Sequence, residues 1–546
     1  MSASLISMAG MLTLLGLAWL LSYDRSAVNI RQLGWGLGLQ VTFALIVLKD
    51  NYWSFIGMSI LGLLIITFLL REAPLPFSEN RRLRFITTSL IGLMAGTIVY
   101  AFTINTGIVT LKILIAALLI SLAVNSWRRW NPALQPFFSV FLIASVIILM
   151  VVNNWHGQYL FKTLGDKVTA FLSMSDYGAA FLFGNLVNPK YFFPQEGTWP
   201  GFGFQFAFKV LPTIIFFGAF MSLLYYAGIM QKIIEALSRF MRWTLGTSGA
   251  ETMSCTANIF VGQTEAPLLV KPFLEGMTRS ELLTIMVGGF ATIAGGVLAG
   301  YIAMGIPASH LIAASVMGAP AALVIGKLIY PEKEMSQTLG DVQMPDIKTG
   351  SNIIEAIANG ISDGFRLAVN VGAMLIGFIA LVALADWLLN IADAYIDGRL
   401  LQGTYVQYSS AGLSPATGEY TGYFPGSVRT IFGSLLKPIA FLMGVPWEDA
   451  SYVGNLIGIK LSLNEFVAYG TMSGYILDNA ISQRSVVIAT YALCGFANFS
   501  SIGIQIGGIS ALAPSRKGDL SRIGLKAMFG GAIASCLNAT IAGMLL

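Results

Sequence analysis

The stretch TANIFVGQTEAPLLVKPF, residues 256–273, sets a carboxylate, Glu265, among amides and apolar side chains. A second stretch, GIKLSLNEFVAYG at residues 458–470, repeats this arrangement around Glu465. Each is short and interrupted by Gly or Pro, so neither can cross a bilayer as one straight helix. Broken backbone is tolerated at membrane depth only where protein or a cavity satisfies it. We therefore predict two re-entrant helical hairpins, at about 250–275 and about 430–475.

An interrupted helix follows each predicted hairpin. After the first comes GGFATIAGGVLAG, residues 288–300, whose Ala-Gly-Gly run favours unwinding. After the second comes CGFANFSSIGIQIGG, residues 494–508, which places Asn498 and Ser501 in mid-membrane. Two halves that each hold a hairpin and a broken helix are typical of inverted-repeat transporters. The free amides and carbonyls at half-helix ends suit a polar solute and a small cation.

The composition predicts a membrane protein. Of 546 residues, 55% are hydrophobic and only 11% are charged, against roughly 25% charged in soluble domains. The mean hydropathy is +0.73, and apolar residues come in long blocks such as 56–70 and 137–152. A large soluble protein would need far more charged surface. We predict an all-α polytopic membrane protein of the inverted-repeat transporter class, in which the two re-entrant hairpins and the two broken helices form a transport domain beside a scaffold.

Candidate spans before the first hairpin alternate with loops of unequal charge. The loops after the first, third and fifth spans hold most of the Lys and Arg residues of this region, whereas the loops after the second and fourth hold almost none. By the positive-inside rule the basic loops are cytoplasmic, which places both the N terminus and the C terminus outside the cell membrane. The predicted spans are 3–22, 33–48, 53–70, 86–102, 106–125, 135–153, 208–229, 282–303, 310–330, 354–393, 482–508 and 524–545.

The spans and loops divide the chain into successive segments. An interfacial helix and an external loop are expected after the sixth span, because Trp and Tyr favour the headgroup layer. The helix within 352–393 is long for one crossing and is predicted to be strongly tilted. The segments are 1–48 (N-terminal helices), 49–153 (additional inserted helices), 154–230 (interfacial helix, external loop and scaffold helix), 231–330 (first transport-domain half), 331–351 (cytoplasmic loop), 352–393 (long scaffold helix), 394–428 (external loop) and 429–546 (second transport-domain half with the final helix).

Several other kinds of chemistry lack the residues they need. The three cysteines lie in apolar or small-residue stretches without metal-like spacing and are interpreted as packing residues. Only two histidines are present, which disfavours a haem or zinc site. Walker A, HExxH and GxSxG patterns do not occur in the sequence, so nothing indicates an enzyme. The net charge of +5 fits basic cytoplasmic loops and calls for no nucleic-acid partner.

The same stretches resemble the concentrative nucleoside transporter family. The matching strings are ANIFVGQTEAPLLVKPF, ATIAGGVLAGYI, GIKLSLNEFVAY, CGFANFSSIGI and LAPSRKGDLSRIGLKA, and the similarity covers about 154–546 and also 1–48. The resemblance implies a sodium-coupled nucleoside symporter that works as a homotrimer. It also implies an elevator-like movement of the transport domain, which holds the site between the hairpins and the broken helices, against a trimeric scaffold.

The resemblance also assigns roles to residues of this sequence. Side chains at the first hairpin would read the nucleobase, and those of the second hairpin and its broken helix would bind the ribose hydroxyls. The assignment is Gln263, Thr264 and Glu265 for the base, Val297 packed beside it, Glu465, Asn498 and Ser501 for the ribose, and Phe496 alongside. The chemistry is sensible in its own right, since a carboxylate accepts from hydroxyl groups and an amide both donates and accepts.

For the coupling cation, the resemblance points to the side chains of Asn258 and Thr292 and to the backbone carbonyls of Val261 and Ile293. Oxygen ligands suit a hard cation. None of these four ligands titrates, which favours sodium over protons. A proton-coupled symporter of nucleosides or of another small polar solute is the alternative, because either intramembrane carboxylate could carry a proton.

Two glycines and two departures complete the comparison with the family. Gly262 and Gly296 leave room where members that exclude purines carry larger side chains, so pyrimidine and purine nucleosides are both expected substrates. The departures are the additional helices of 49–153 and a longer external loop at 394–428, neither of which holds the motifs. A channel built from the same hairpins is a further reading, and it would let solute run only down its gradient.

Overall fold

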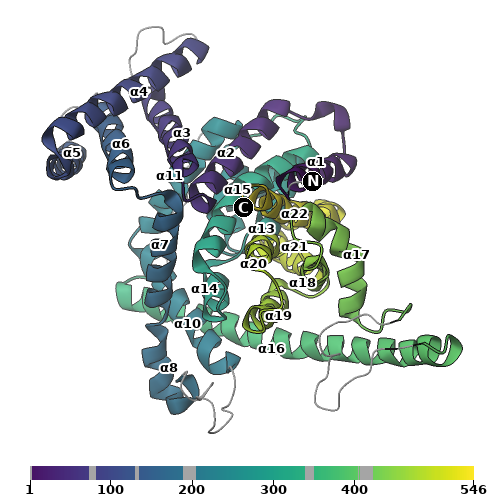
Figure 1. The fold of residues 1–546 in the computed structure, drawn as a ribbon. Helices are drawn as coiled ribbons and strands as arrows, with labels where there is room; N and C mark the ends of the chain where they lie inside the picture. The colour runs from purple at the N-terminus through teal and green to yellow at the C-terminus, as the bar shows by residue number, and fades with distance from the viewer. Residues whose placement is uncertain are drawn as a thin grey trace. The chain divides into compact units, whose positions relative to one another are not determined.

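The computed structural model describes residues 3–72, 81–128, 134–188, 205–338, 350–403, 405 and 422–546. Within these residues the regular secondary structure is helical and no strand occurs, so the predicted all-α architecture is confirmed (Figure 1). Ten helical segments of this described part are long and apolar enough to cross a membrane. Each predicted span falls on one helix or, at the two predicted breaks, on a pair of half-helices.

The helices are given in two groups, in the order of the chain. The first group is α1 (Ala3–Leu20), α2 (Ile30–Leu48), α3 (Tyr52–Leu69), α4 (Arg81–Thr106), α5 (Ile108–Arg128), α6 (Gln135–Val152), α7 (Gly157–Leu172), α8 (Ser175–Phe183), α10 (Phe206–Tyr226) and α11 (Ile229–Leu245). The second group is α12 (Gly249–Ala257), η4 (Ala266–Gly276), α13 (Arg279–Ala291), α14 (Gly295–Ala303), α15 (Ala308–Ile329), α16 (Ile353–Asp393), α17 (Val428–Leu442), α18 (Ala450–Ser462), α19 (Glu465–Leu477), α20 (Gln483–Leu493), α21 (Phe499–Leu512) and α22 (Lys517–Leu545).

The chain folds into two compact units, and the residues of one unit nearly coincide with those of the predicted insert. Unit 2 comprises Gly38–Leu164, whereas Met1–Leu37 and Gly165–Met544 belong to unit 1. In unit 2, α3, α4 and α5 pack against α6. Their shared core consists of Ile66, Leu70, Ala95, Val99, Leu111, Val140 and Ala144. Large apolar side chains on the outer faces of α4 and α5 stay exposed in the isolated chain, as expected for helices that face lipid.

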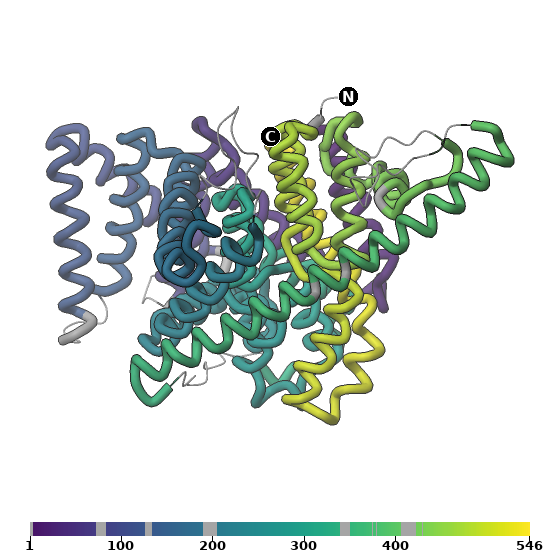
Figure 2. Tube along the Cα trace, turned by 90° about the horizontal axis from the view of Figure 1, so that it is seen from below, coloured from purple at the N-terminus to yellow at the C-terminus, as the bar shows by residue number. Residues whose placement is uncertain are grey.

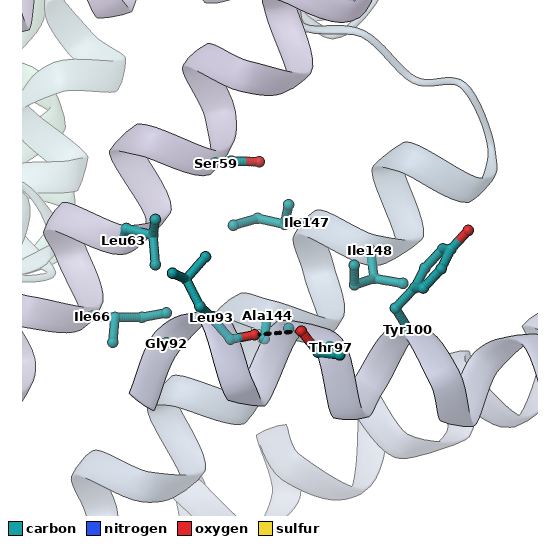
Figure 3. A pocket seen from close by; sticks show the side chains of 11 residues that line it. Ser59, Leu63, Ile66, Gly92, Leu93, Thr97, Tyr100, Ala144, Ile147 and Ile148 are labelled. Atoms are coloured by element: carbon teal, nitrogen blue, oxygen red, sulfur yellow. Dashed lines mark hydrogen bonds between the residues drawn. The ribbon is translucent and has the colours of Figure 1, made fainter. Parts of the chain in front are cut away.

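A cavity of about 300 Å³ lies within unit 2 between α3, α4 and α6 (Figure 3). Its walls are mostly apolar, with side chains such as Leu63, Ile147 and Ile148. The hydroxyl of Thr97 donates to the Leu93 carbonyl of its own helix at 2.9 Å. No charged residue lines the cavity, and none of the predicted site residues contributes to it. It is therefore unsuited to a polar solute.

Unit 1 contains both the predicted scaffold helices and the predicted transport domain. The helices α10 and α16 pack against each other through glycines. A Cβ at Gly218 would lie 2.7 Å from the Gly360 carbonyl oxygen, and a Cβ at Gly364 would lie 2.9 Å from the Cα of Ile215. Small residues allow the backbones of membrane helices to approach this closely, and so stabilise the contact between the helices. Figure 2 shows α16 as one long helix that slants across the helices of the second half, while its tilt in a membrane stays a prediction.

Both predicted hairpins consist of a helix, a sharp break and a second helix packed against the first. In the first, α12 is followed after the break by the 3-10 helix η4, where Pro272 removes a backbone donor that an α-helix would use. The second consists of α18 and α19. The range predicted for it, 430–475, also takes in most of α17, which is a separate helix. The second pair therefore begins at Ala450 rather than near residue 430. Insertion of either pair into a membrane from one side stays a prediction.

The two predicted helix breaks are present. Residues 292–294 separate α13 from α14, and residues 494–498 separate α20 from α21. In the second break Gly495 has φ +131°, and a Cβ there would lie 2.5 Å from the carbonyl oxygen of Phe290 on α13. Only glycine fits this conformation and this close approach. The two breaks are thus packed together in the middle of unit 1.

The predicted polar loops fall only partly on the described residues. Residues 339–349 of the predicted cytoplasmic loop, and residues 404 and 406–421 of the predicted external loop, lie outside them. At the start of the latter loop a π-helical turn, η5 (Ala394–Leu400), extends α16. The lengths and membrane sides of these loops stay predictions.

Candidate functional site

The two hairpins are linked through a chain of hydrogen bonds between buried side chains. Gln263, after the break in the first hairpin, donates from Nε2 to the hydroxyl oxygen of Ser501 at 3.2 Å. The backbone amide of Ser501 donates to Asn498 Oδ1 at 2.8 Å. Asn498 in turn donates from Nδ2 to Glu465 Oε2 at 3.2 Å. Four predicted substrate residues from both halves of the chain are thus brought together, and all four side chains are buried.

The carboxyl group in this hydrogen-bonded chain belongs to Glu465, which is only 3% exposed. It is the first residue of α19, where the positive end of the helix dipole favours a carboxylate. Besides Asn498, the hydroxyl of Tyr301 donates to it, to Oε1 at 3.1 Å. An ionised carboxylate offers about four acceptor positions. Two donors therefore leave further lone pairs for the hydroxyl groups of a ligand.

The structure adds two residues that the sequence analysis did not single out. Tyr301 on α14 is fully buried and carries its hydroxyl from the first half to the acid of the second. Gln505 on α21 donates from Nε2 both to Gln263 Oε1 at 3.0 Å and to the Met286 carbonyl at 3.1 Å. A signal existed in each case: Gln505 is an amide inside an apolar helix, one turn after Ser501, and Tyr301 lies one turn after Val297.

The other four predicted substrate residues lie outside this hydrogen-bonded chain. Glu265 accepts from the backbone amide of Gly262 at 3.2 Å, and its side chain is exposed. Thr264 packs against α21, where a Cβ at Gly508 would lie 3.0 Å from its methyl carbon. Val297 is buried on α14, and Phe496 is half-buried within the second break. Their predicted contacts with a nucleoside stay predictions.

The predicted cation ligands converge on the first break. Asn258 is fully buried, yet neither atom of its side-chain amide has a hydrogen-bond partner. A Cβ at Gly288 would lie 3.4 Å from Asn258 Nδ2, and the hydroxyl of Thr292 donates to the Gly288 carbonyl at 2.8 Å. Both predicted side-chain ligands therefore lie close to Gly288 on α13. An unpaired buried amide costs free energy, so its oxygen is a fitting ligand for a small cation.

The two segments that carry the predicted backbone ligands are joined by a hydrogen bond. The backbone amide of Gly295 donates to the Phe260 carbonyl at 3.0 Å, and this bond ties the break of the first hairpin to the break between α13 and α14. Phe260 precedes Val261, and Gly295 follows closely after Ile293. The four predicted ligands thus come from two segments that the fold holds together. This set of oxygens, with no titrating side chain, fits sodium.

Three sequence families match this chain in succession. Residues 9–69 match the family described as Na+ dependent nucleoside transporter N-terminus, and residues 207–308 match the one described as nucleoside recognition. Residues 310–543 match Na+ dependent nucleoside transporter C-terminus. The N-terminal match reaches beyond residue 48 and includes α3, which the sequence analysis placed in the insert. Residues 70–206 lie between the matched ranges.

Curated relatives agree with these matches. An uncharacterized transporter of Haemophilus influenzae is 43% identical over 71% of this chain and 86% of its own length. The nucleoside permease NupC of Helicobacter pylori is 40% identical over 75% of this chain and 90% of its own. Sodium/nucleoside cotransporter 1 of Sus scrofa is 41% identical over 77% of this chain, which matches only 60% of that longer protein.

Solved structures of similar fold cover the chain from end to end. The structure of CNTnw in an inward-facing substrate-bound state superposes with a TM-score of 0.70 at 32% identity, over 100% of this chain and 98% of that one. A CNTnw variant in an outward-facing state gives a TM-score of 0.71 at 32% identity, over 100% of this chain and 97% of that one. The predicted transporter fold is therefore confirmed.

Proposed function

We propose that this protein takes up nucleosides by symport with sodium, because the chain belongs to the Na+-dependent nucleoside transporter family. It is therefore a membrane transporter and not an enzyme. The observation that carries the proposal is the hydrogen-bonded chain from Gln263 through Ser501 and Asn498 to Glu465. It joins an amide that suits a nucleobase edge to a carboxylate that suits ribose hydroxyls, as a nucleoside requires.

The substrate role of each side chain follows from its position in this series of hydrogen bonds. Gln263, with Thr264 and Glu265 beside it, reads the base, while Val297 packs against the base. Glu465, Asn498 and Ser501 bind the ribose, and Phe496 lies alongside. A site built from buried polar groups discriminates strongly, because an analogue without a hydroxyl leaves one of those groups unpaired.

The coupling ion is sodium, held by the Asn258 and Thr292 side chains and by the carbonyls of Val261 and Ile293. The unpaired amide of Asn258 supports this assignment. Sodium links the first hairpin to the first break, next to the segment that presents Gln263 to the substrate. Binding of the ion therefore favours the arrangement of the hairpin that binds nucleoside.

Substrate breadth and large-scale movement extend the proposal. A Cβ at Gly262 would meet its nearest atom at 3.6 Å and one at Gly296 at 3.5 Å, which are ordinary contact distances. Space at these two positions supports transport of purine as well as pyrimidine nucleosides. We further propose that the protein is a homotrimer in the cell membrane, with both termini outside. Its transport domain moves as an elevator against a scaffold that includes α10 and α16.

The experiment that tests this function is uptake of radiolabelled uridine into proteoliposomes. An inward sodium gradient is compared with the same gradient of choline. Accumulation above the equilibrium level with sodium alone is the expected result. Accumulation with choline under an imposed pH gradient would replace sodium by protons as the coupling ion, and uptake that never exceeds equilibrium would identify a channel.

A further inference from the structure

Lys460 is a buried charge that the proposed transport chemistry does not use. It lies on α18, five residues before Glu465, and only 1% of it is exposed. A lysine at this depth in a membrane protein is expensive and requires a compensating contact. Its Nζ donates to the backbone carbonyl of Ala492 at 2.9 Å.

The Ala492 carbonyl belongs to the broken end of α20. The last carbonyls of a helix have no partner within it and form the negative end of its dipole. Here three carbonyls at and next to this end, including that of Ala492, accept from side chains of other segments. The hydroxyl of Tyr469 donates to the Thr490 carbonyl at 2.8 Å, and the hydroxyl of Ser535 donates to the Cys494 carbonyl at 2.7 Å.

Both arms of the second hairpin therefore cap this end. Lys460 belongs to α18 and Tyr469 to α19, whereas the start of α19 presents Glu465 to Asn498 beyond the break. The hairpin is thus fastened on both sides of the break, to the carbonyl end of α20 and to the amide end of α21. Its single positive charge lies on the carbonyl side, where the dipole favours a cation.

In the first half of the polypeptide, the broken end of the helix is compensated in a different way. At the break after α13, the buried side chain that approaches is Asn258, whose amide has no partner. There the proposed sodium ion supplies the positive charge. Each half then has one cation beside the broken end of its helix: an exchangeable ion in the first and a lysine ammonium in the second.

We propose that Lys460 is a positioning residue that holds the second hairpin against the end of α20 and so keeps Glu465 in reach of the ribose. This inference rests on the proposed function, because it assigns Glu465 to the substrate. It predicts that Lys460 acts on nucleoside recognition and leaves the sodium site unchanged.

The test compares wild-type protein with Lys460→Met, which keeps an unbranched side chain of nearly the same length but lacks the ammonium group. Uptake of uridine and of 3′-deoxyuridine is measured in proteoliposomes, each at varied sodium. Loss of a hydrogen bond to a charged group is expected to raise the half-saturating uridine concentration roughly tenfold or more. The preference for uridine over 3′-deoxyuridine should shrink, while the sodium concentration for half-maximal uptake at saturating uridine stays at the wild-type value.

Lys437→Met is the matched control, because the ammonium group of Lys437 lies over the ring of Trp447 at 4.3 Å. It should transport like wild type. Should Lys460→Met fail to give monodisperse protein, Lys460→Gln is measured against the same criteria. Unchanged uridine affinity and preference would overturn the proposal. So would an equal loss for both nucleosides together with a shifted sodium response, which would indicate general damage. Wild-type protein without sodium-driven uptake would instead overturn the proposed function, and this inference with it.

Discussion

Asn498 donates a hydrogen bond from Nδ2 to the carboxylate of Glu465 at 3.2 Å, while its Oδ1 accepts from the backbone amide of Ser501. The same side chain therefore caps the half-helix α21 and orients the buried acid of the second hairpin. With both ends of the amide engaged, neither the carboxylate nor the cap can shift without the other. The geometry of the second hairpin and that of the second break are coupled through this one residue.

Glu465→Gln should weaken nucleoside binding. Asn498 and Tyr301 both donate to the carboxylate, so a neutral amide at this position must turn its own NH₂ group toward one of these donors. It also accepts less strongly from ribose hydroxyls. We expect the half-saturating uridine concentration to rise about ten- to a hundredfold, on the basis of about 1.5–3 kcal/mol for a hydrogen bond to a charged group. Uridine uptake kinetics at saturating sodium measure this, and wild-type kinetics in the variant would remove the second hairpin from the site.

Tyr301→Phe should have a smaller effect in the same direction. The change deletes one of the two side-chain donors to Glu465 and keeps the ring that packs against Tyr469 at a centroid distance of 4.3 Å. A net loss of about 1 kcal/mol corresponds to about a fivefold rise in the half-saturating uridine concentration. Tyr491→Phe is the matched control, because the buried hydroxyl of Tyr491 has no hydrogen-bond partner. Equal kinetics in the two variants would contradict a role for Tyr301.

The sequence predicted the helices, the breaks and most of the buried polar chain, because each leaves a local signal. A carboxylate within an apolar stretch, such as Glu465, stands out because burying a charge in a membrane is costly. Runs of glycine indicate backbone that readily leaves the helical conformation. Asn498 and Ser501 lie beside such signals, whereas Gln263 was assigned through the resemblance to the family. The 3-10 helix η4 and the separate helix α17 differ from the predicted hairpins. Neither difference changes which residues form the buried hydrogen-bonded chain.

The residues that sequence analysis missed act over long distances in the chain. Tyr301 reaches a residue 164 positions away, and Gln505 reaches one 242 positions away. A tyrosine in an apolar helix is as consistent with packing as with hydrogen bonding, so only the fold identifies its partner. Lys460 stood within a quoted motif, but its role depends on the carbonyl of Ala492, which no side-chain pattern reveals.

Gln505→Leu should impair recognition at the first hairpin. Without this amide, Gln263 loses the donor to its Oε1 and is held only through its bond to Ser501. We expect about a three- to tenfold loss of uridine affinity, as for one neutral hydrogen bond, with the sodium response unaltered. Competition by adenosine against labelled uridine would show whether base preference changes. A variant whose uridine affinity is equal to that of wild type would mean that Gln505 only fills space.

Thr292→Val should raise the sodium concentration needed for half-maximal uptake and leave the maximal rate at high sodium near the wild-type value. Valine matches the shape of threonine but cannot supply an oxygen ligand. Thr284→Val is the control, since the hydroxyl of Thr284 donates to Ser280 in its own helix. Both hydroxyls are buried on or beside α13, so packing effects should be similar. A sodium response shifted equally in both variants, or in neither, would refute the assignment of the ion to Thr292.

Lys327→Met should reduce stability far more than it reduces nucleoside affinity. Lys327 near the end of α15 lies 2.8 Å from Glu251 at the start of α12, and both side chains are almost fully buried. Removing the lysine leaves the acid charged and unpaired in the interior, at a cost of about 3–5 kcal/mol. The exposed pair of Arg239 and Glu235 provides the control, because Arg239→Ala should cost less than about 1 kcal/mol. Thermal unfolding in detergent compares the two.

The double variant Lys327→Met with Glu251→Gln separates the cost of an unpaired charge from that of a lost contact. Neutralising the partner should recover a large part of the lost stability, since a buried pair contributes little beyond compensating for its own desolvation. The second carboxylate near the lysine, Glu332 at 3.1 Å, is partly exposed and can be solvated after the change. If the double variant were less stable than Lys327→Met alone, the pair would be a net attraction between α12 and α15 rather than a matched burial of charge.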